Sequence, residues 1–249
     1  MTITIAPIAY IRTGFSEKFG IPRQSLAAKE PKGIVEFAEP YRDGNALRGL
    51  SAFSHIWLIW QFSNHAEKVE KEEFRPTVRP PRLGGNERMG VFATRSPYRP
   101  NSLGLSLVKL EEILMESVYQ EGEKGPALLV SGVDLLDGTP IFDIKPYIPF
   151  LESVPDARGG FTEGPWTANK ENNESRLAVV FAPEAKTILT EHAEAVEEIL
   201  SLDPRPSYQE EEKRVYGLEY AGYNVRFRVE GDTVKVIQVE PLENKDKRE

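Results

Sequence analysis

The sequence predicts a mainly β, barrel-like N-terminal domain of non-Rossmann type, followed by a small α+β C-terminal domain. Short apolar segments separated by turn residues fill the chain up to position 150, and no long helical pattern alternates with them. This pattern favours a mainly antiparallel barrel over a doubly wound sheet. The stretch 151–175 is rich in Gly, Pro, Asn and Glu and lacks apolar periodicity, which is typical of a linker.

The expected barrel strands are short, rich in β-branched and aromatic residues, and bounded by Gly, Pro, Asn or Asp. They lie at 2–11, 33–37, 56–62, 90–94, 103–113, 127–133 and 141–144. Beyond the linker, 177–181 is typical of a strand, and 183–200 of a helix because its apolar residues are spaced by three and four. Further strands are expected at 215–220, 223–229 and 233–239, with hairpin turns between them.

These elements divide the chain into a barrel domain at 1–155, a linker at 156–175 and a β-α-β-β-β module at 176–242. The length of 249 residues agrees with this division, because domains of about 150 residues are common.

Composition excludes several classes of protein. The chain has no Cys, so zinc ribbons, disulfide scaffolds, iron–sulfur clusters and thiolate catalysis are excluded. His65 and His192 have no companion ligands at metal spacing, so we expect no metal site. The longest apolar run, 56–60, is far shorter than the ~20 residues of a membrane-spanning helix, and the first residues do not resemble a secretory signal. We therefore expect a cytoplasmic protein that does not associate with membranes.

Positive charge is concentrated in one segment of an acidic chain. The net charge is −8, yet 75–109 carries seven basic residues against one acid, Glu87. Arginine binds phosphate groups bidentately and keeps its charge, so the segment favours a phosphate-bearing partner over a merely solvated loop. The many Pro and Gly residues in 75–104 indicate a loop of fixed shape, and Arg99 and Asn101 are among the polar residues that it presents to a nucleotide or another polar ligand. No Rossmann or P-loop glycine fingerprint is present.

Three motifs carry a resemblance to a known family. They are FSHIWLIWQF at 53–62, RPTVRPPRLGGNERMGVFATRSPYRPNSLG at 75–104 and DGTPIFDIKPYIP at 137–149. In this order they resemble the bacterial tRNA (adenine37-N6)-methyltransferase family, and DPRPSY at 203–208 with YNVRFRV at 223–229 resembles its C-terminal domain. The resemblance implies a β-barrel enzyme that uses S-adenosylmethionine and acts as a homodimer. Its implied substrate is N6-threonylcarbamoyladenosine at position 37 of tRNA, chiefly threonine tRNA.

The resemblance also implies a cofactor pocket, carried over residue by residue. Its positions in this chain are Gln24, Ser25, Leu26, Ser63, Asn64, Arg95, Leu105, Ser131, Gly132, Val133 and Asp134. The chain departs from the family pattern at Ser63-Asn64, where some members carry a His-Gln pair, and it is one residue shorter after Gln24.

Candidate catalytic residues are Asp143 and Lys145 in the DIKPY motif. They are two positions apart on an expected strand, so their side chains share a face, as a structural ion pair or as a functional pair. The N6 of a threonylcarbamoylated adenine is a weak, urea-type nucleophile, so proton removal would assist methyl transfer. We favour Asp143 as the group that positions the adenine or takes the proton.

The C-terminal domain offers a candidate tRNA-contacting face. Arg226 and Arg228 share one face of an expected strand, and Arg205 is held between two prolines. A solvated sheet face explains the same pattern equally well. Two other functions stay open at this point: a non-catalytic RNA- or nucleotide-binding protein, and a small-molecule methyltransferase.

Overall fold

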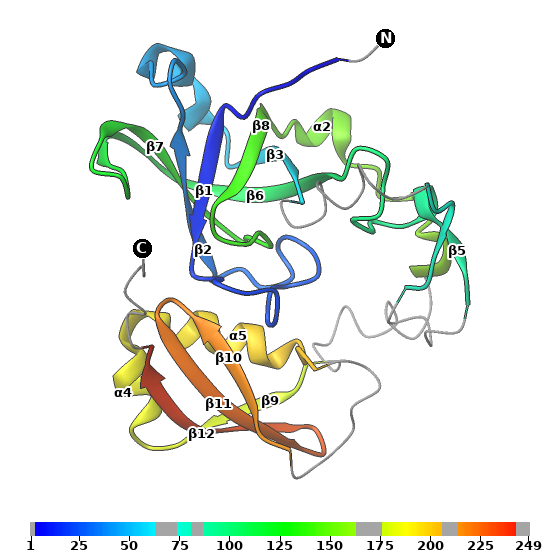
Figure 1. Cartoon of the computed structure of the whole chain (residues 1–249), viewed down its shortest axis with the longest axis vertical. Helices are drawn as coiled ribbons and strands as arrows, with labels where there is room; N and C mark the ends of the chain where they lie inside the picture. Colours follow the sequence, from blue (N-terminus) through cyan, green and yellow to red (C-terminus); the bar gives the residue numbers. More distant parts are fainter. Residues whose placement is uncertain (1–2, 63–73, 81–86, 163–175, 206–213, 243–249) are drawn as a thin grey trace.

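The computed structural model describes residues 3–62, 74–80, 87–162, 176–205 and 214–242. Within these ranges, six strands close into an antiparallel barrel in the order β1-β2-β7-β6-β3-β8 (Figure 1). The barrel strands are β1 (Ala9–Thr13), β2 (Lys32–Phe37), β3 (His55–Gln61), β6 (Leu103–Val118), β7 (Lys124–Ser131) and β8 (Thr139–Pro146). Closure pairs each of these strands on both sides. The predicted barrel is therefore confirmed.

Strand β3 shows why this sequence forms a barrel. Its residues alternate between buried and half-buried, and Ile56, Leu58 and Trp60 point into the core. This period of two is the pattern of a strand that has one face on a hydrophobic core. The outward residues include Trp57, whose indole donates a hydrogen bond to Glu152.

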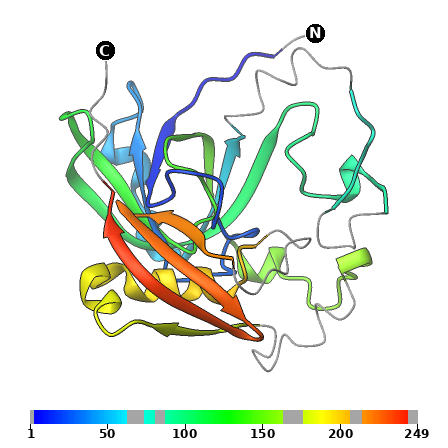
Figure 2. The same cartoon turned by 60° about the horizontal axis from the view of Figure 1, so that its bottom comes forward.

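The C-terminal domain has the predicted β-α-β-β-β order. Its sheet runs β10-β11-β12-β9, with β9 parallel to β12 and the other neighbours antiparallel. The strands are β9 (Ala178–Phe181), β10 (Tyr216–Tyr220), β11 (Tyr223–Glu230) and β12 (Thr233–Pro241). The helices α4 (Ala185–Leu189) and α5 (Ala193–Ser201) cover one face of this sheet (Figure 2).

Three sequence expectations differ from the structure. The helix expected at 183–200 is broken between α4 and α5 by a 3-10 turn, where Thr190 has a φ of 51°. The strand expected at 90–94 is wrong: β5 (Met89–Gly90) pairs with β4 (Thr77–Val78), and a 3-10 turn, Val91–Ala93, follows. The first strand begins at Ala9 rather than at position 2, where its pairing with β2 and β8 starts.

The connection from β1 to β2 lies between the two domains. This segment, the β1–β2 loop (residues 14–31), descends from the barrel and lies against the C-terminal domain (Figure 1). After β8, the chain forms the short helix α2 (Pro149–Glu152) and a 3-10 turn, Gly160–Thr162. Positions 163–175 of the expected linker lie outside the described residues. In the part of the chain that is described, no helix is long and apolar enough to cross a membrane.

Candidate functional site

A cavity of about 660 Å³ opens at one end of the barrel. Its wall combines the β1–β2 loop, the end of β3, the loop at 94–99, the start of β6 and the segment at 134–139. Most of the motif-bearing segments therefore meet at one place, although they are far apart in the sequence. The volume and the mixed polar and apolar wall are typical of a small-molecule site.

Two opposite charges face this cavity. Arg95, which is exposed, donates a hydrogen bond from Nη1 to Oε1 of Gln24 in the β1–β2 loop. Asp134 also lines the cavity, and it accepts a hydrogen bond from the hydroxyl of Ser106, at 2.6 Å. That hydroxyl in turn accepts from the indole Nε1 of Trp60, at 2.9 Å. The carboxylate is thus fixed by a chain of hydrogen bonds that begins in the barrel core.

Burial raises the pKa of Asp134 to about 6, and the hydrogen bond from Ser106 offsets part of the effect. Loss of hydration destabilises the charged form of a carboxylic acid, which explains the direction. A carboxylate that titrates near neutrality attracts a cationic ligand and can also exchange a proton.

Apolar side chains form another part of the cavity wall. Ile59, Phe62, Leu103 and Leu105 line it together with Gly104, and the side chain of Leu105 is 53% exposed. An exposed Leu beside these groups provides a surface that a ligand with an apolar or aromatic face can cover.

The structure brings part of the expected cofactor site together. Gln24, Arg95, Leu105 and Asp134 line the cavity. Other members lie behind this wall: the amide of Leu107 donates to Ser25 Oγ at 3.1 Å, and the amide of Leu26 donates to the carbonyl of Gly132 at 2.9 Å.

Ser131 and Val133 are also absent from the described cavity wall. Ser131 is buried and donates to Glu111 at 2.5 Å, and Val133 lies fully in the barrel core. Ser63 and Asn64 lie outside the described residues.

A second cavity, of about 1340 Å³, adjoins the first. Arg75, Arg79 and Arg88 line it, and it shares Gln24, Thr94 and Arg95 with the first cavity. The basic segment of the sequence therefore forms a concave wall next to the smaller cavity. This arrangement suits a polyanion whose reactive part enters the smaller cavity.

Of the two expected substrate residues in the 75–104 loop, only Arg99 is in a described cavity lining. Arg99 lines the first cavity and donates from Nη1 to the carbonyl of Thr94 at 2.6 Å. Asn101 is absent from the described linings of both cavities, and its carbonyl accepts a hydrogen bond from Gln61 at 3.4 Å.

Asp143 and Lys145 form an exposed pair on the outer surface of the barrel. The distance between Asp143 Oδ2 and Lys145 Nζ is 3.9 Å, and both side chains are more than half exposed. Asp143 pairs across the strands with Ile59, which lines the first cavity, so the carboxylate lies next to the cavity without being part of its described wall.

The arginines of the C-terminal domain differ from one another. Arg205 is not held outward as expected, because a bidentate pair ties it to Asp203. Arg226 and Arg228 are exposed on one face of β11, as expected. Arg228 Nε lies 2.7 Å from Glu230 Oε1.

Sequence reasoning missed several residues of the cavity wall. Lys18, Ile59, Phe62 and Thr139 all contribute to it. Ile59 belongs to β3 and Phe62 directly follows it, in a segment whose alternation predicts a strand, but alternation does not show which end of a barrel is hollow. Among the described residues, no group of three or more His, Asp or Glu is arranged to hold a metal ion.

Comparison with known families matches both domains. The model of the tRNA-methyltransferase O N-terminal domain matches residues 10–153, and the model of the TrmO C-terminal domain matches residues 174–242. These two matches cover nearly all of the barrel, most of the residues that line its cavities, and the α+β domain.

Individual proteins match along nearly the whole chain. The tRNA (adenine(37)-N6)-methyltransferase of Escherichia coli K12 is 41% identical over 243 residues, covering 94% of this chain and 96% of the relative. A putative S-adenosylmethionine-dependent methyltransferase, RcsF, of Pseudomonas aeruginosa PAO1 is 40% identical and covers 96% of this chain and 98% of its own length. A crystal structure of TrmO from Pseudomonas aeruginosa superposes with a TM-score of 0.72 at 34% identity, covering 96% of this chain and 99% of that one.

Proposed function

Because this chain belongs to the tRNA-methyltransferase O family and is an S-adenosylmethionine-dependent tRNA (adenine-N6)-methyltransferase, we propose that it methylates N6 of N6-threonylcarbamoyladenosine at position 37 of tRNA, chiefly threonine tRNA. The observation that carries the proposal is the barrel cavity, which collects residues of all three N-terminal family motifs and adjoins a basic concave wall.

The donor set of the cavity fits S-adenosylmethionine. The molecule has two positive centres, a carboxylate, a ribose and a flat base, and the cavity offers a carboxylate at Asp134, a guanidinium at Arg95, an amide at Gln24 and an apolar wall at Leu105. We assign these residues to cofactor binding, with Ser25, Leu26 and Gly132 supporting them from behind. The bound cofactor supplies an electrophilic methyl group.

Methyl transfer to N6 requires a group that accepts the N6 proton, and we assign this role to a carboxylate. Asp143, paired with Lys145 beside the cavity, is our candidate, and its exposed position lets it meet a base that enters from solvent. In this role Lys145 orients Asp143. Alignment of nucleophile and methyl group can lower the barrier by about 7–11 kcal/mol.

The larger cavity is the route that we assign to the RNA. Arg75, Arg79 and Arg88 would neutralise backbone phosphates there, while Arg99 and Asn101 guide the target nucleotide to the cofactor. Arg226 and Arg228 would extend the contact over the C-terminal domain.

Assembly and location complete the proposal. We assign the active form to a homodimer in the cytoplasm, where its tRNA substrate occurs. Phe150 and Leu151 in α2 and Val154 just after it have side chains that are 64–84% exposed, and exposed apolar residues close together in the chain are typical of a subunit interface.

The test is a labelling assay. The purified protein is incubated with methyl-labelled S-adenosylmethionine and bulk tRNA from cells that lack the activity, and the digested tRNA is analysed by mass spectrometry. We expect label in methylated threonylcarbamoyladenosine, and tRNA without the threonylcarbamoyl group to be a poor acceptor. Label in unmodified adenosine would contradict the proposed substrate. No label in tRNA would favour a binding protein if S-adenosylmethionine is left intact, and a small-molecule methyltransferase if it is consumed.

A further inference from the structure

The β1–β2 loop has two opposite faces. Residues 21–24 of this loop form one wall of the smaller cavity. Its other side packs on the C-terminal sheet, where Phe15 meets Tyr220 with ring centroids 5.0 Å apart and Phe19 meets Phe227 at 6.4 Å. The C-terminal domain thus contacts the same loop that forms one wall of the cavity.

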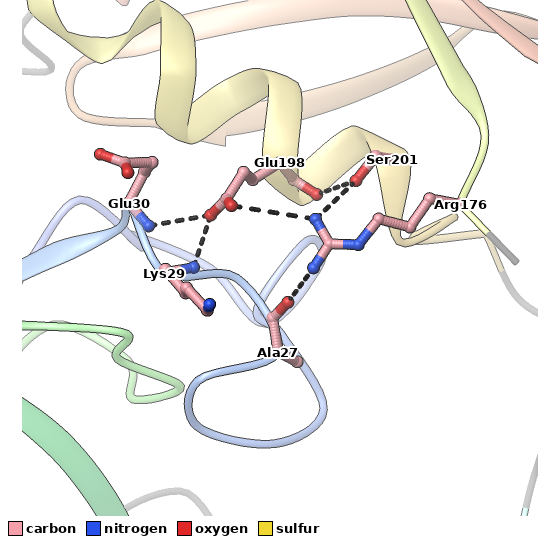
Figure 3. A network of polar contacts seen from close by, with 6 residues as sticks. All are labelled: Ala27, Lys29, Glu30, Arg176, Glu198 and Ser201. Atoms are coloured by element: carbon pink, nitrogen blue, oxygen red, sulfur yellow. Dashed lines mark hydrogen bonds and ion pairs between the residues drawn. The ribbon is translucent and has the colours of Figure 1, made fainter. Parts of the chain in front are cut away.

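A polar network fixes the second half of this loop (Figure 3). Glu198 of α5 accepts hydrogen bonds on Oε2 from the backbone amides of Lys29, at 2.5 Å, and Glu30, at 2.8 Å. Arg176, just before β9, donates to the carbonyl of Ala27 at 2.7 Å and lies 3.8 Å from the carboxylate of Glu198. Hydrogen bonds to charged groups are stronger than those between neutral groups.

These contacts act next to the cofactor-binding positions. Ala27 follows Leu26, which has a φ of 62° and is bonded through its amide to Gly132 of the barrel. A non-glycine residue keeps such a conformation when its surroundings hold it on several sides. Here the barrel holds Leu26 from one side, and Arg176 holds the adjacent peptide from the other.

We propose that Glu198 and Arg176 of the C-terminal domain are positioning residues for cofactor binding, which shape the β1–β2 loop so that Gln24 faces the cavity. The inference rests on the proposed function of the cavity as the S-adenosylmethionine site. It gives the C-terminal domain a role at the cofactor site that is separate from contact with tRNA.

The experiment compares Glu198→Ala with Glu198→Gln and with a matched control, Glu197→Gln. Glu197 lies beside Glu198 on α5 but pairs with Lys186 within the C-terminal domain, at 2.8 Å. For each full-length variant, the Kd of S-adenosylmethionine is measured by calorimetry, the Kd of tRNA by filter binding and the melting temperature without ligand. KM for the cofactor and kcat are measured separately.

We expect Glu198→Ala to raise the Kd and KM of S-adenosylmethionine about tenfold, with kcat at saturating cofactor and the Kd of tRNA changed less than about twofold. Glu198→Gln keeps an oxygen that accepts both amides, so its Kd should stay within about threefold of the wild type. Glu197→Gln should not differ from the wild type. A lower melting temperature with unchanged cofactor affinity would overturn the inference in favour of a purely structural contact.

The substitution Arg176→Met is a second, independent test of the proposed positioning role. It removes the bond to Ala27 while keeping most of the apolar stem, and it leaves α5 intact, so it tests the inference even if Glu198→Ala does not fold. We expect the same rise in the Kd of S-adenosylmethionine. A weaker affinity for tRNA without a change for the cofactor would overturn the inference. Failure of the wild type to bind S-adenosylmethionine would instead refute the proposed function of the cavity.

Discussion

At the scale of single residues, Asp134 links stability to the site. Its pKa of about 6 in the folded protein exceeds the ordinary value of 3.8, so the folded state binds this proton more tightly than the unfolded chain does. The free energy of unfolding therefore falls as the pH rises between these two values, and the loss is complete above about pH 6. The cavity keeps a carboxylate that reduces the stability of the ligand-free protein.

This linkage predicts that Asp134→Asn stabilises the ligand-free protein while weakening cofactor binding. At pH 8 we expect the free energy of unfolding to rise by up to about 3 kcal/mol, and the gain to shrink as the pH falls through about 6. Urea unfolding of both proteins at pH values from 5 to about 8 measures it. Asp143→Asn, at an exposed position, is the control and should change stability by less than about 0.5 kcal/mol. A gain that does not depend on pH would contradict the argument.

Arg95 gives a second prediction at this scale. Arg95→Ala removes a guanidinium from the cavity and the hydrogen bond that holds Gln24. Because a hydrogen bond to a charged group is worth about 1.5–3 kcal/mol, we expect the Kd of S-adenosylmethionine to rise about 10- to 100-fold and turnover to be lost at ordinary cofactor concentrations. Calorimetry checks it, with the exposed Arg48→Ala as control. Unchanged affinity in a folded Arg95→Ala protein would refute the assignment.

The sequence could indicate some of these residues and not others, for physical reasons. Arg95 lies in the 75–104 motif and Asp134 is one of the cofactor positions that the family resemblance implies, and both line the cavity. Lys18 lies in no quoted motif, and Thr139 lies in the 137–149 motif without a signal that it lines a cavity. Both reach the cavity only through closure of the barrel and folding of the β1–β2 loop. The spacing of Asp143 and Lys145 predicted a shared face, but it could not say whether that face lines the cavity.

At the scale of elements, the junction of β3 with β6 shapes the cavity floor. Gly104 pairs with Trp60, and a Cβ on Gly104 would lie 2.3 Å from the Trp60 ring, well inside contact distance. The ring approaches the strand this closely because glycine has no side chain, and its indole then reaches Ser106.

Gly104→Ala is therefore predicted to displace Trp60. We expect a loss of about 1–3 kcal/mol in stability from overpacking, a shift in tryptophan fluorescence and weaker binding of S-adenosylmethionine. Gly90→Ala is the control, since Gly90 has an ordinary φ of −58° and no heavy atom within 4 Å of an added Cβ. Equal effects of the two substitutions would contradict the role given to Gly104.

Elements with strong periodicity were predictable, and those defined by tertiary pairing were not. The alternation in β3 and the spacing of apolar residues in α5 identify both elements. The 90–94 segment has the composition of a strand, but it pairs for two residues with β4 and then turns. Its Pro- and Gly-rich neighbours favour that turn over a longer ladder.

At the scale of the whole molecule, the contact between the domains could not be predicted from the sequence. The bond from Arg176 to Ala27 joins residues 149 positions apart, and no local pattern encodes such a partner. The division into barrel and α+β module could be predicted because the apolar residues of each part follow their own spacing in the sequence. How the β1–β2 loop lies between them depends on the packing of Phe15 and Phe19 on the second sheet.

The same arrangement determines where a tRNA contact can lie on the C-terminal domain. Phe227 faces the β1–β2 loop, so Arg226 and Arg228, its neighbours in β11, point to the opposite face of the sheet. Arg228 is paired with Glu230, whereas Arg226 carries no such ion pair among the contacts of the described residues. If RNA wraps from the larger cavity onto this face, Arg226 should contribute more than Arg228.

The double variant Arg226→Ala/Arg228→Ala tests this path through salt dependence. Each lost phosphate contact lowers the slope of log K against log salt concentration by about 0.7–0.9, so we expect the slope to flatten by about 1–2 and cofactor affinity to stay unchanged. An Arg48→Ala/Lys124→Ala variant, which removes the same charge from exposed positions of the barrel, separates local contact from the effect of net charge. An equal flattening in both double variants would mean that tRNA responds to the overall field of the protein and that the β11 face makes no contact of its own.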